Sequence, residues 1–132
     1  MRVAIGTDDL TTIRSGHFGE SKYFKIFEVE DGRVTEKEVR ENPFLQPESE
    51  DTHHHGEAKK IMGFLKDCDI FIARSMGLHS IPKLIKMGVK PLITRQTGIR
   101  QAVETLAKGD TDSFLCFDGE TKKFNPCKER FE

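Results

Sequence analysis

Residues 70–73 form a continuous apolar run, Ile-Phe-Ile-Ala, between Asp69 and Arg74. A strand whose successive side chains are all apolar is buried on both faces, and such strands occur inside parallel sheets. Parallel strands need crossover connections, which are usually helices that cover the faces of the sheet. This run therefore predicts an α/β fold.

The first third of the chain predicts an antiparallel meander. Residues 2–6 are mostly apolar and end at a glycine, which indicates a buried strand. An aromatic-rich strand over residues 23–29 is followed by Asp31-Gly32, a dipeptide typical of tight hairpins, and then by a charged strand over residues 33–41. The scarcity of apolar residues in that last strand favours a place at the edge of the sheet.

Apolar residues at helical spacing dominate the chain after residue 56. Three segments with this spacing predict helices, one starting at Gly56, one from Pro82 to Gly88 and one from Ile99 to Gly109. Strands over residues 70–73 and 89–94 alternate with these helices, so the two strands form a parallel βαβ unit. We therefore expect a mixed five-stranded sheet with the first strand at its centre.

Residues 110–132 lie beyond this pattern. We expect an α/β domain over residues 1–109 and a C-terminal extension over residues 110–132. The turn signal Asp118-Gly119 leaves two alternatives open for the extension, which are a small added hairpin and a loosely ordered tail.

Membrane insertion and export are not expected. No window approaches the roughly 18 consecutive apolar residues that a bilayer span requires, and Met1 leads almost directly into a strand. The three cysteines are odd in number and widely spaced, so they predict neither a disulfide framework nor a four-thiolate metal site. We expect Cys68 and Cys116 to be buried and Cys127 to be exposed, in a reducing, cytoplasmic setting.

Charge is distributed unevenly along the chain. Residues 28–51 carry nine acidic and three basic side chains, a balance of −6, whereas residues 52–109 carry ten basic and four acidic ones, a balance of +6. The second half of the fold is therefore able to attract an anion. Solvated helix faces are the simpler explanation for any single lysine in this set.

Two glycine-bearing segments follow predicted strands at the edge where ligands bind in open α/β sheets. They are Gly16-His17-Phe18-Gly19, after the first strand, and Arg74-Ser75-Met76-Gly77, after the fourth. Backbone N–H groups of glycine loops, with an imidazole or guanidinium nearby, can cradle an anion or a metal cluster. We expect both segments to face one cleft and to contact a bound group there.

Three adjacent histidines, His53, His54 and His55, end a loop of about 14 residues over positions 42–55. Imidazole is the commonest protein metal ligand, and His17 together with one or more of these three is the predicted ligand set. The alternatives are solvated imidazoles at the loop end, and a hydrogen-bonded turn residue at His17. We expect the loop to be mobile without cargo, and His79 to matter less.

Several of these segments, in this order, resemble the dinitrogenase iron–molybdenum cofactor biosynthesis family. The resemblance rests on Val3-Ala4-Ile5, the 16–19 loop, Glu41-Asn42-Pro43, the histidine-rich loop and residues 68–77, and it covers roughly residues 1–109. It implies a ribonuclease H-like fold and the carriage of metal–sulfur clusters, including iron–molybdenum cofactor precursors, without a reaction of its own. Glu20 and the extension beyond residue 109 depart from the family pattern.

Together, residues and resemblance predict a non-catalytic protein that binds or carries an anionic cluster of iron–molybdenum cofactor type or of another iron–sulfur or molybdenum–sulfur composition. The expected partners are the cluster or its precursor and cluster donor or acceptor proteins, and neither nucleic acid nor membrane. The alternative is a protein-interaction or regulatory module of the same fold. A metal-dependent nuclease is disfavoured because it needs several converging carboxylates, and only Asp8 and Asp9 follow the first strand.

Overall fold

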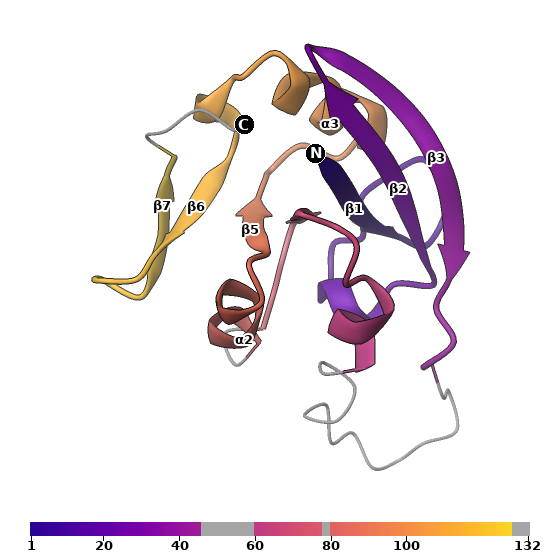
Figure 1. The fold of residues 1–132 in the computed structure, drawn as a ribbon, viewed down its shortest axis with the longest axis horizontal. Helices are drawn as coiled ribbons and strands as arrows, with labels where there is room; N and C mark the ends of the chain where they lie inside the picture. The colour runs from indigo at the N-terminus through magenta and orange to yellow at the C-terminus, as the bar shows by residue number, and fades with distance from the viewer. Residues whose placement is uncertain (46–59, 78–79, 128–132) are drawn as a thin grey trace.

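The computed structural model describes residues 1–45, 60–77 and 80–127. These residues form a seven-stranded mixed sheet in the order β3-β2-β1-β4-β5-β6-β7 (Figure 1). The strands are β1 (Arg2–Thr7), β2 (Tyr23–Glu30), β3 (Arg33–Glu41), β4 (Ile70–Ala73), β5 (Lys90–Ile93), β6 (Leu115–Asp118) and β7 (Lys123–Pro126). The predicted α/β class is confirmed, but the prediction of five strands is wrong.

The antiparallel meander forms as expected. β1 pairs with β2 from Arg2 opposite Glu28 to Thr7 opposite Tyr23, and β2 pairs in turn with β3. Asp31 and Gly32 connect β2 to β3 with φ values of 51° and 77°. This left-handed backbone is what an Asp-Gly hairpin turn requires, because glycine adopts it without steric cost.

The second half of the chain forms the predicted parallel part of the sheet. β4 pairs in parallel with β1 and with β5, and β4 is buried along its whole length. Short helical segments connect or follow the strands. They are the 3-10 turns η1 (Phe18–Glu20) and η2 (Thr111–Ser113), helical residues 60–64, α2 (Ile81–Lys86) and α3 (Ile99–Ala107).

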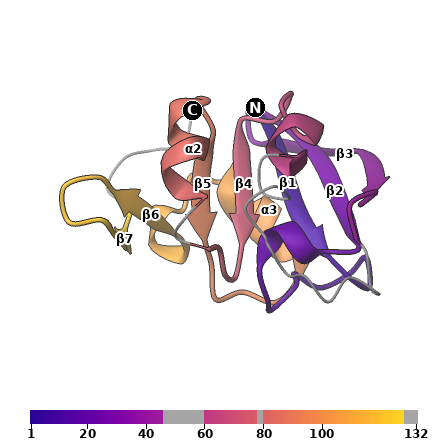
Figure 2. The same ribbon diagram turned by 90° about the horizontal axis from the view of Figure 1, so that it is seen from below.

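Each face of the sheet carries its own apolar core. On one face α3 packs through Ile99, Val103 and Leu106 against side chains that include Val3 and Leu92. On the other face helical residues 60–64 and α2 pack against β4 and β2. Figure 2 shows α2 and α3 on opposite sides of the sheet. The amphipathic patterns therefore predict the helix positions correctly, although residues 56–59, where the first helix was expected to begin, lie outside the described residues.

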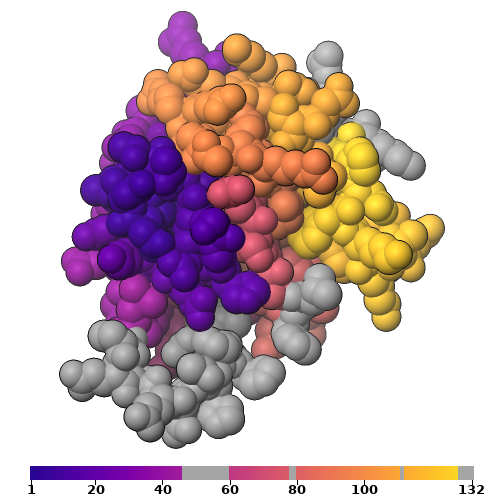
Figure 3. Space-filling view, turned by 180° about the vertical axis from the view of Figure 1, so that it is seen from behind, coloured from indigo at the N-terminus to yellow at the C-terminus, as the bar shows by residue number. Residues whose placement is uncertain are grey.

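The C-terminal extension forms a hairpin that continues the sheet. β6 pairs antiparallel with β5, through Leu92 opposite Cys116 and Ile93 opposite Leu115, and with β7 along its whole length. Figure 3 shows this hairpin in yellow at one side of the molecule, next to the orange region that contains α3. Of the two alternatives for the extension, the hairpin is the one observed, and it accounts for the two additional strands.

The cysteines depart from the expectation drawn from their number. Cys116 and Cys127 form a disulfide with their Cα atoms 4.9 Å apart. Cys127 is only 6% exposed and belongs to the core on the α3 side, so the prediction of an exposed Cys127 is wrong. An odd cysteine count leaves one thiol unpaired but does not prevent the other two from pairing across a hairpin. Cys68, as predicted, is a buried free thiol.

None of the described helices is long and apolar enough to cross a membrane.

Candidate functional site

The two glycine-bearing segments singled out in the sequence lie side by side at the carboxyl edge of the parallel strands. His17 and Ser75 form an isolated parallel bridge, and the Phe18 N–H donates to the Ser75 carbonyl at 3.2 Å. The two segments are therefore adjacent, as predicted, whereas the cleft that they were expected to share stays a prediction. The Ile13 N–H also donates to the Thr97 carbonyl at 2.8 Å, so the loop after β5 joins them.

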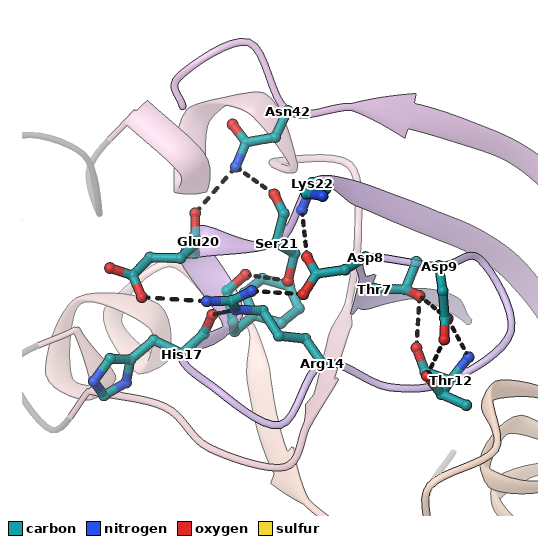
Figure 4. Close-up of polar contacts among 12 residues, drawn as sticks. Thr7, Asp8, Asp9, Thr12, Arg14, His17, Glu20, Ser21, Lys22 and Asn42 are labelled. Carbon is teal, nitrogen blue, oxygen red and sulfur yellow. Dashed lines mark hydrogen bonds and ion pairs between the residues drawn. The ribbon is translucent and has the colours of Figure 1, made fainter. Parts of the chain in front are cut away.

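Arg14 holds the loop after β1 in shape (Figure 4). Its guanidinium donates to the His17 carbonyl at 3.1 Å and to the Asp8 carboxylate at 2.6 Å, and lies 3.7 Å from a Glu20 carboxylate oxygen. One side chain thus connects the start, middle and end of the loop. This role is not predictable from the sequence, because an isolated arginine in a polar loop has no distinguishing pattern.

The carboxylates after β1 are engaged in holding the loop. Asp8 accepts from Arg14 and from the Lys22 N–H, the latter at 3.0 Å. Asp9 accepts from the Thr12 hydroxyl and from the N–H groups of Thr11 and Thr12, at 2.6–2.9 Å. These hydrogen bonds, led by that of the Thr12 hydroxyl, hold the pKa of Asp9 well below its usual range. Both carboxylates therefore act as local supports.

The backbone of β1 at Gly6 lies in close contact with residues 18–21, which holds this segment against the end of β1. A Cβ atom on Gly6 would overlap the Ser21 hydroxyl and lie 3.3 Å from the Phe18 carbonyl oxygen, so only glycine fits there without a shift. The Ser21 hydroxyl donates to that same carbonyl at 2.7 Å. The buried Asn42 amide donates to the Gly19 and Ser21 carbonyls at 3.1 and 2.8 Å, which ties the segment to the end of β3.

Within the first segment, Phe18 and His17 point to different environments. The Phe18 ring is 6% exposed and packs in the core, so its side chain anchors the loop. His17 is exposed and makes no side-chain hydrogen bond to the following turn. Figure 4 shows its imidazole directed away from the Arg14 cluster. Gly16 packs against Arg14, since a Cβ atom on Gly16 would lie only 3.2 Å from the Arg14 guanidinium. A Cβ atom on Gly19 would meet a less crowded environment.

The second segment adds positive charge to the same edge. Arg74, Ser75, Met76 and Gly77 follow β4 and are all half-buried. Arg95 follows β5 at the neighbouring strand end and is exposed. Within the described part of the chain, neither Arg74 nor Arg95 forms an ion pair, whereas Arg14 is paired with acids. Arg95 was missed by the sequence analysis because it lies in no glycine-bearing motif.

The described residues do not contain a complete metal site. Among residues 1–45, 60–77 and 80–127, no three histidine, cysteine, aspartate or glutamate side chains are grouped so that they could hold a metal ion. The predicted ligands His53, His54 and His55, and also His79, lie outside the described residues. Burial raises the pKa of the Cys68 thiol to about 12, so Cys68 is a packing residue with no thiolate to offer at neutral pH.

Comparisons with solved structures support the fold. The chain is 27% identical to PH0822, with a TM-score of 0.64, covering 83% of this chain and 92% of that one. A protein from Methanocaldococcus jannaschii is 18% identical, with a TM-score of 0.63 and coverage of 88% and 93%. The apo form of the orange protein from Desulfovibrio gigas is 20% identical, with a TM-score of 0.63 and coverage of 82% and 88%. At such identities the last two show similarity of fold alone.

Family assignment rests on the sequence. No curated protein matches the chain. The model of the family described as dinitrogenase iron-molybdenum cofactor matches residues 1–109, the region that contains β1 to α3 and both glycine-bearing segments. The match covers most of the chain and ends where the C-terminal extension begins. The chain therefore belongs to the dinitrogenase iron-molybdenum cofactor family.

Proposed function

We propose that this protein binds and carries an anionic metal–sulfur cluster at the carboxyl edge of its parallel strands, without a reaction of its own. The observation that carries the proposal is the pairing of His17 with Ser75, which brings an exposed imidazole next to the segment that starts with Arg74. Family membership supports a role connected with the iron–molybdenum cofactor. Cluster donor and acceptor proteins are the partners that such a carrier needs.

The charges at this edge suit an anionic cargo. Asp8 and Asp9 are occupied by hydrogen bonds from their own loop, and Glu20 lies beside Arg14. Arg74 and Arg95, at the ends of neighbouring strands, have no acidic partner among the described side chains. The edge therefore has positive charge available for a negatively charged ligand.

The donor atoms at this edge suit a transition metal. The His17 imidazole is exposed, and the Met76 thioether lies two residues after Arg74 in the adjoining segment. Imidazole binds iron, and sulfur ligands favour soft metals and metal–sulfur clusters. Two such donors do not complete a coordination sphere, and we propose His53, His54 and His55 as further ligands.

We also infer that residues 1–109 have a ribonuclease H-like arrangement. The supporting features are an antiparallel meander of β1, β2 and β3 with β1 in the interior, followed by β4 and β5 in parallel with β1. The carboxylates expected of a nuclease of this topology are not free at the end of β1, because Asp8 and Asp9 support the loop. The topology is therefore compatible with a binding protein.

Anaerobic reconstitution with iron, sulfide and molybdate tests the proposal. The parent protein is expected to retain metal and sulfide after gel filtration and to show cluster absorption in the visible range, where the polypeptide itself does not absorb. His17→Ala should weaken retention by at least about tenfold, the lower bound seen when partners of metal ligands are removed. His17→Cys, which restores a metal-binding side chain, should recover part of it.

A matched control is Lys37→Ala, which replaces an exposed side chain on the distant strand β3. This variant should retain cluster as the parent does. Equal retention by the parent, His17→Ala and the triple variant His53→Ala/His54→Ala/His55→Ala would remove imidazole ligation from the proposal. Absence of bound metal and sulfide in the parent itself would refute cluster carriage and favour a protein-interaction module.

A further inference from the structure

A groove with a volume of about 810 Å³ lies between the start of β5 and the C-terminal hairpin. It exists because β5 and β6 pair only through Leu92 opposite Cys116 and Ile93 opposite Leu115, after which the two strands separate. Its walls are largely apolar, and both cysteines of the Cys116–Cys127 disulfide line it. It is distinct from the loops after β1 and β4, none of whose residues line it.

We propose that the Cys116–Cys127 disulfide is a site of thiol–disulfide exchange with a dithiol reductant that enters through this groove. The inference does not depend on cluster carriage, because the disulfide belongs to the extension, beyond the part of the chain that matches the family. Exchange requires that an attacking thiolate reach one of the sulfurs, and the groove offers a route because both cysteines line it.

The surroundings of the two sulfurs assign their roles. Cys116 is half-buried on β6, whereas Cys127 is 6% exposed and packs in the core on the α3 side. The attacking thiolate therefore bonds to Sγ of Cys116, and Sγ of Cys127 leaves with the bonding electron pair and takes up a proton. The second thiol of the reductant then displaces Cys116. The reductant loses two electrons and two protons, and both cysteines become thiols.

Reduction changes how firmly the hairpin is held. Besides the disulfide and the short β5–β6 ladder, the Cys127 N–H donates to the Phe114 carbonyl at 3.4 Å, and the Thr94 hydroxyl donates to the Ser113 carbonyl at 3.1 Å. The Thr94 bond holds the start of the extension, whereas the disulfide joins β6 to the residue after β7 and so is the covalent restraint on the outer strand of the hairpin. After reduction, residues 119–127 are expected to open more often than β6 does.

Native thiol labelling tests the exchange, with dithiothreitol as the dithiol. Oxidised protein should take up no maleimide, because its remaining thiol, Cys68, is buried. After dithiothreitol treatment without denaturant, mass spectrometry should find two labels, at Cys116 and Cys127, and none at Cys68. Amide exchange should then rise in residues 119–127 and stay unchanged in β1 and β4. A requirement for denaturant before any label appears would overturn the proposal.

Two pairs of variants test the route and the order of attack. Ile85 and Met87 are both exposed, at 47% and 49%, but only Ile85 lines the groove. Ile85→Trp should slow native reduction several-fold, whereas Met87→Trp should not. Cys127→Ser, which leaves Cys116 free, should react with an aromatic disulfide reagent faster than Cys116→Ser does. Equal reduction rates in the two tryptophan variants, or the reverse order in the serine variants, would contradict the mechanism.

Discussion

The Phe18 ring stacks on the Phe71 ring, with centroids 4.8 Å apart and planes inclined by 16°. Phe18 belongs to the loop after β1, and Phe71 lies at the middle of β4. The contact fixes the depth at which the loop sits on the sheet, and Phe18 also packs on Phe24 at 5.1 Å. The exposed His17 is therefore held beside Ser75 by its buried neighbour in the chain.

Replacing Phe18 should damage both stability and the site. Phe18→Ala is expected to lower the free energy of unfolding by about 3–5 kcal/mol, because it removes a buried ring and leaves a cavity. His17→Ala should change stability by less than about 0.5 kcal/mol, because His17 is exposed. Urea unfolding followed by circular dichroism measures both changes. If Phe18→Ala lowered the free energy of unfolding by less than about 1 kcal/mol, the ring would not be an anchor of the loop.

The close contact between Gly6 and Ser21 predicts that a single added methyl group is destabilising. Gly6→Ala should cost about 1–3 kcal/mol, because the added methyl group overlaps the Ser21 hydroxyl. Gly77→Ala is the matched control, since among the described residues, its chain neighbours aside, no atom lies within 4 Å of its Cβ position. The double variant Gly6→Ala/Ser21→Ala should be less destabilised than the sum of the two single changes. Strict additivity of the two changes would argue against this overlap.

The ion pairs around Asp67 predict a dependence of stability on pH. Asp67 accepts two hydrogen bonds from Arg40, at 2.7 and 2.9 Å, and one from Arg2 at 2.9 Å. The bonds from Arg40 in particular hold the pKa of this carboxyl well below its usual range. A lowered carboxyl pKa adds stability above the unfolded pKa of about 3.9, and this stability is lost as the pH falls toward the folded value.

Asp67→Asn should therefore destabilise the protein at pH 7, and its difference from the parent should shrink as the pH falls below about 4. Urea unfolding of both proteins from pH 7 to pH 3 provides the test. A difference that is constant over this range would mean that the ionised carboxylate is not the source of the effect.

Arg74 and Arg95, which form no ion pair with another described residue, should control retention of an anionic cargo at the carboxyl edge. Arg74→Ala/Arg95→Ala is expected to lower the cluster content after reconstitution and to reduce the sensitivity of retention to salt, because screening acts on charge attraction. Arg33→Ala/Lys37→Ala removes the same charge from β3 and should have neither effect. Metal and sulfide analysis at two salt concentrations measures the outcome, and equal losses in both double variants would indicate a general effect of net charge.

The sequence predicts the elements whose apolar pattern is decided locally. The run at residues 70–73 and the Asp31-Gly32 turn each specify a strand or a hairpin without help from distant residues. The proximity of the segments that contain His17 and Ser75 follows from topology, because β1 and β4 are parallel neighbours, but the pairing of these two residues does not. The disulfide could not be predicted from the sequence. It depends on the register of β6 against β7, which no local sequence pattern specifies.

The roles of individual polar side chains are also hard to predict from sequence. Arg14 organises its loop through three separate segments, and Asn42 does so from the end of β3, twenty-one residues after Ser21. Each contact needs the fold to exist before the partners meet. A glycine motif marks a segment that lies close to other backbone, but it does not identify the side chain that secures it.

The hairpin of β6 and β7 also determines which strand borders solvent on this side of the sheet. Without it, the free N–H and C=O groups would be those of β5, where Pro91 and Leu92 are buried and Ile93 is half-buried. With it, the outermost strand is β7, where Lys123 and Pro126 are exposed and Pro126 has no N–H to donate. β5 also carries a lysine and a proline, Lys90 and Pro91, so the two borders differ mainly in the apolar side chains of Leu92 and Ile93, which pair with β6 when the hairpin is in place. Detachment of the hairpin would expose β5 as an unpaired edge strand, and the protein would then become prone to aggregate.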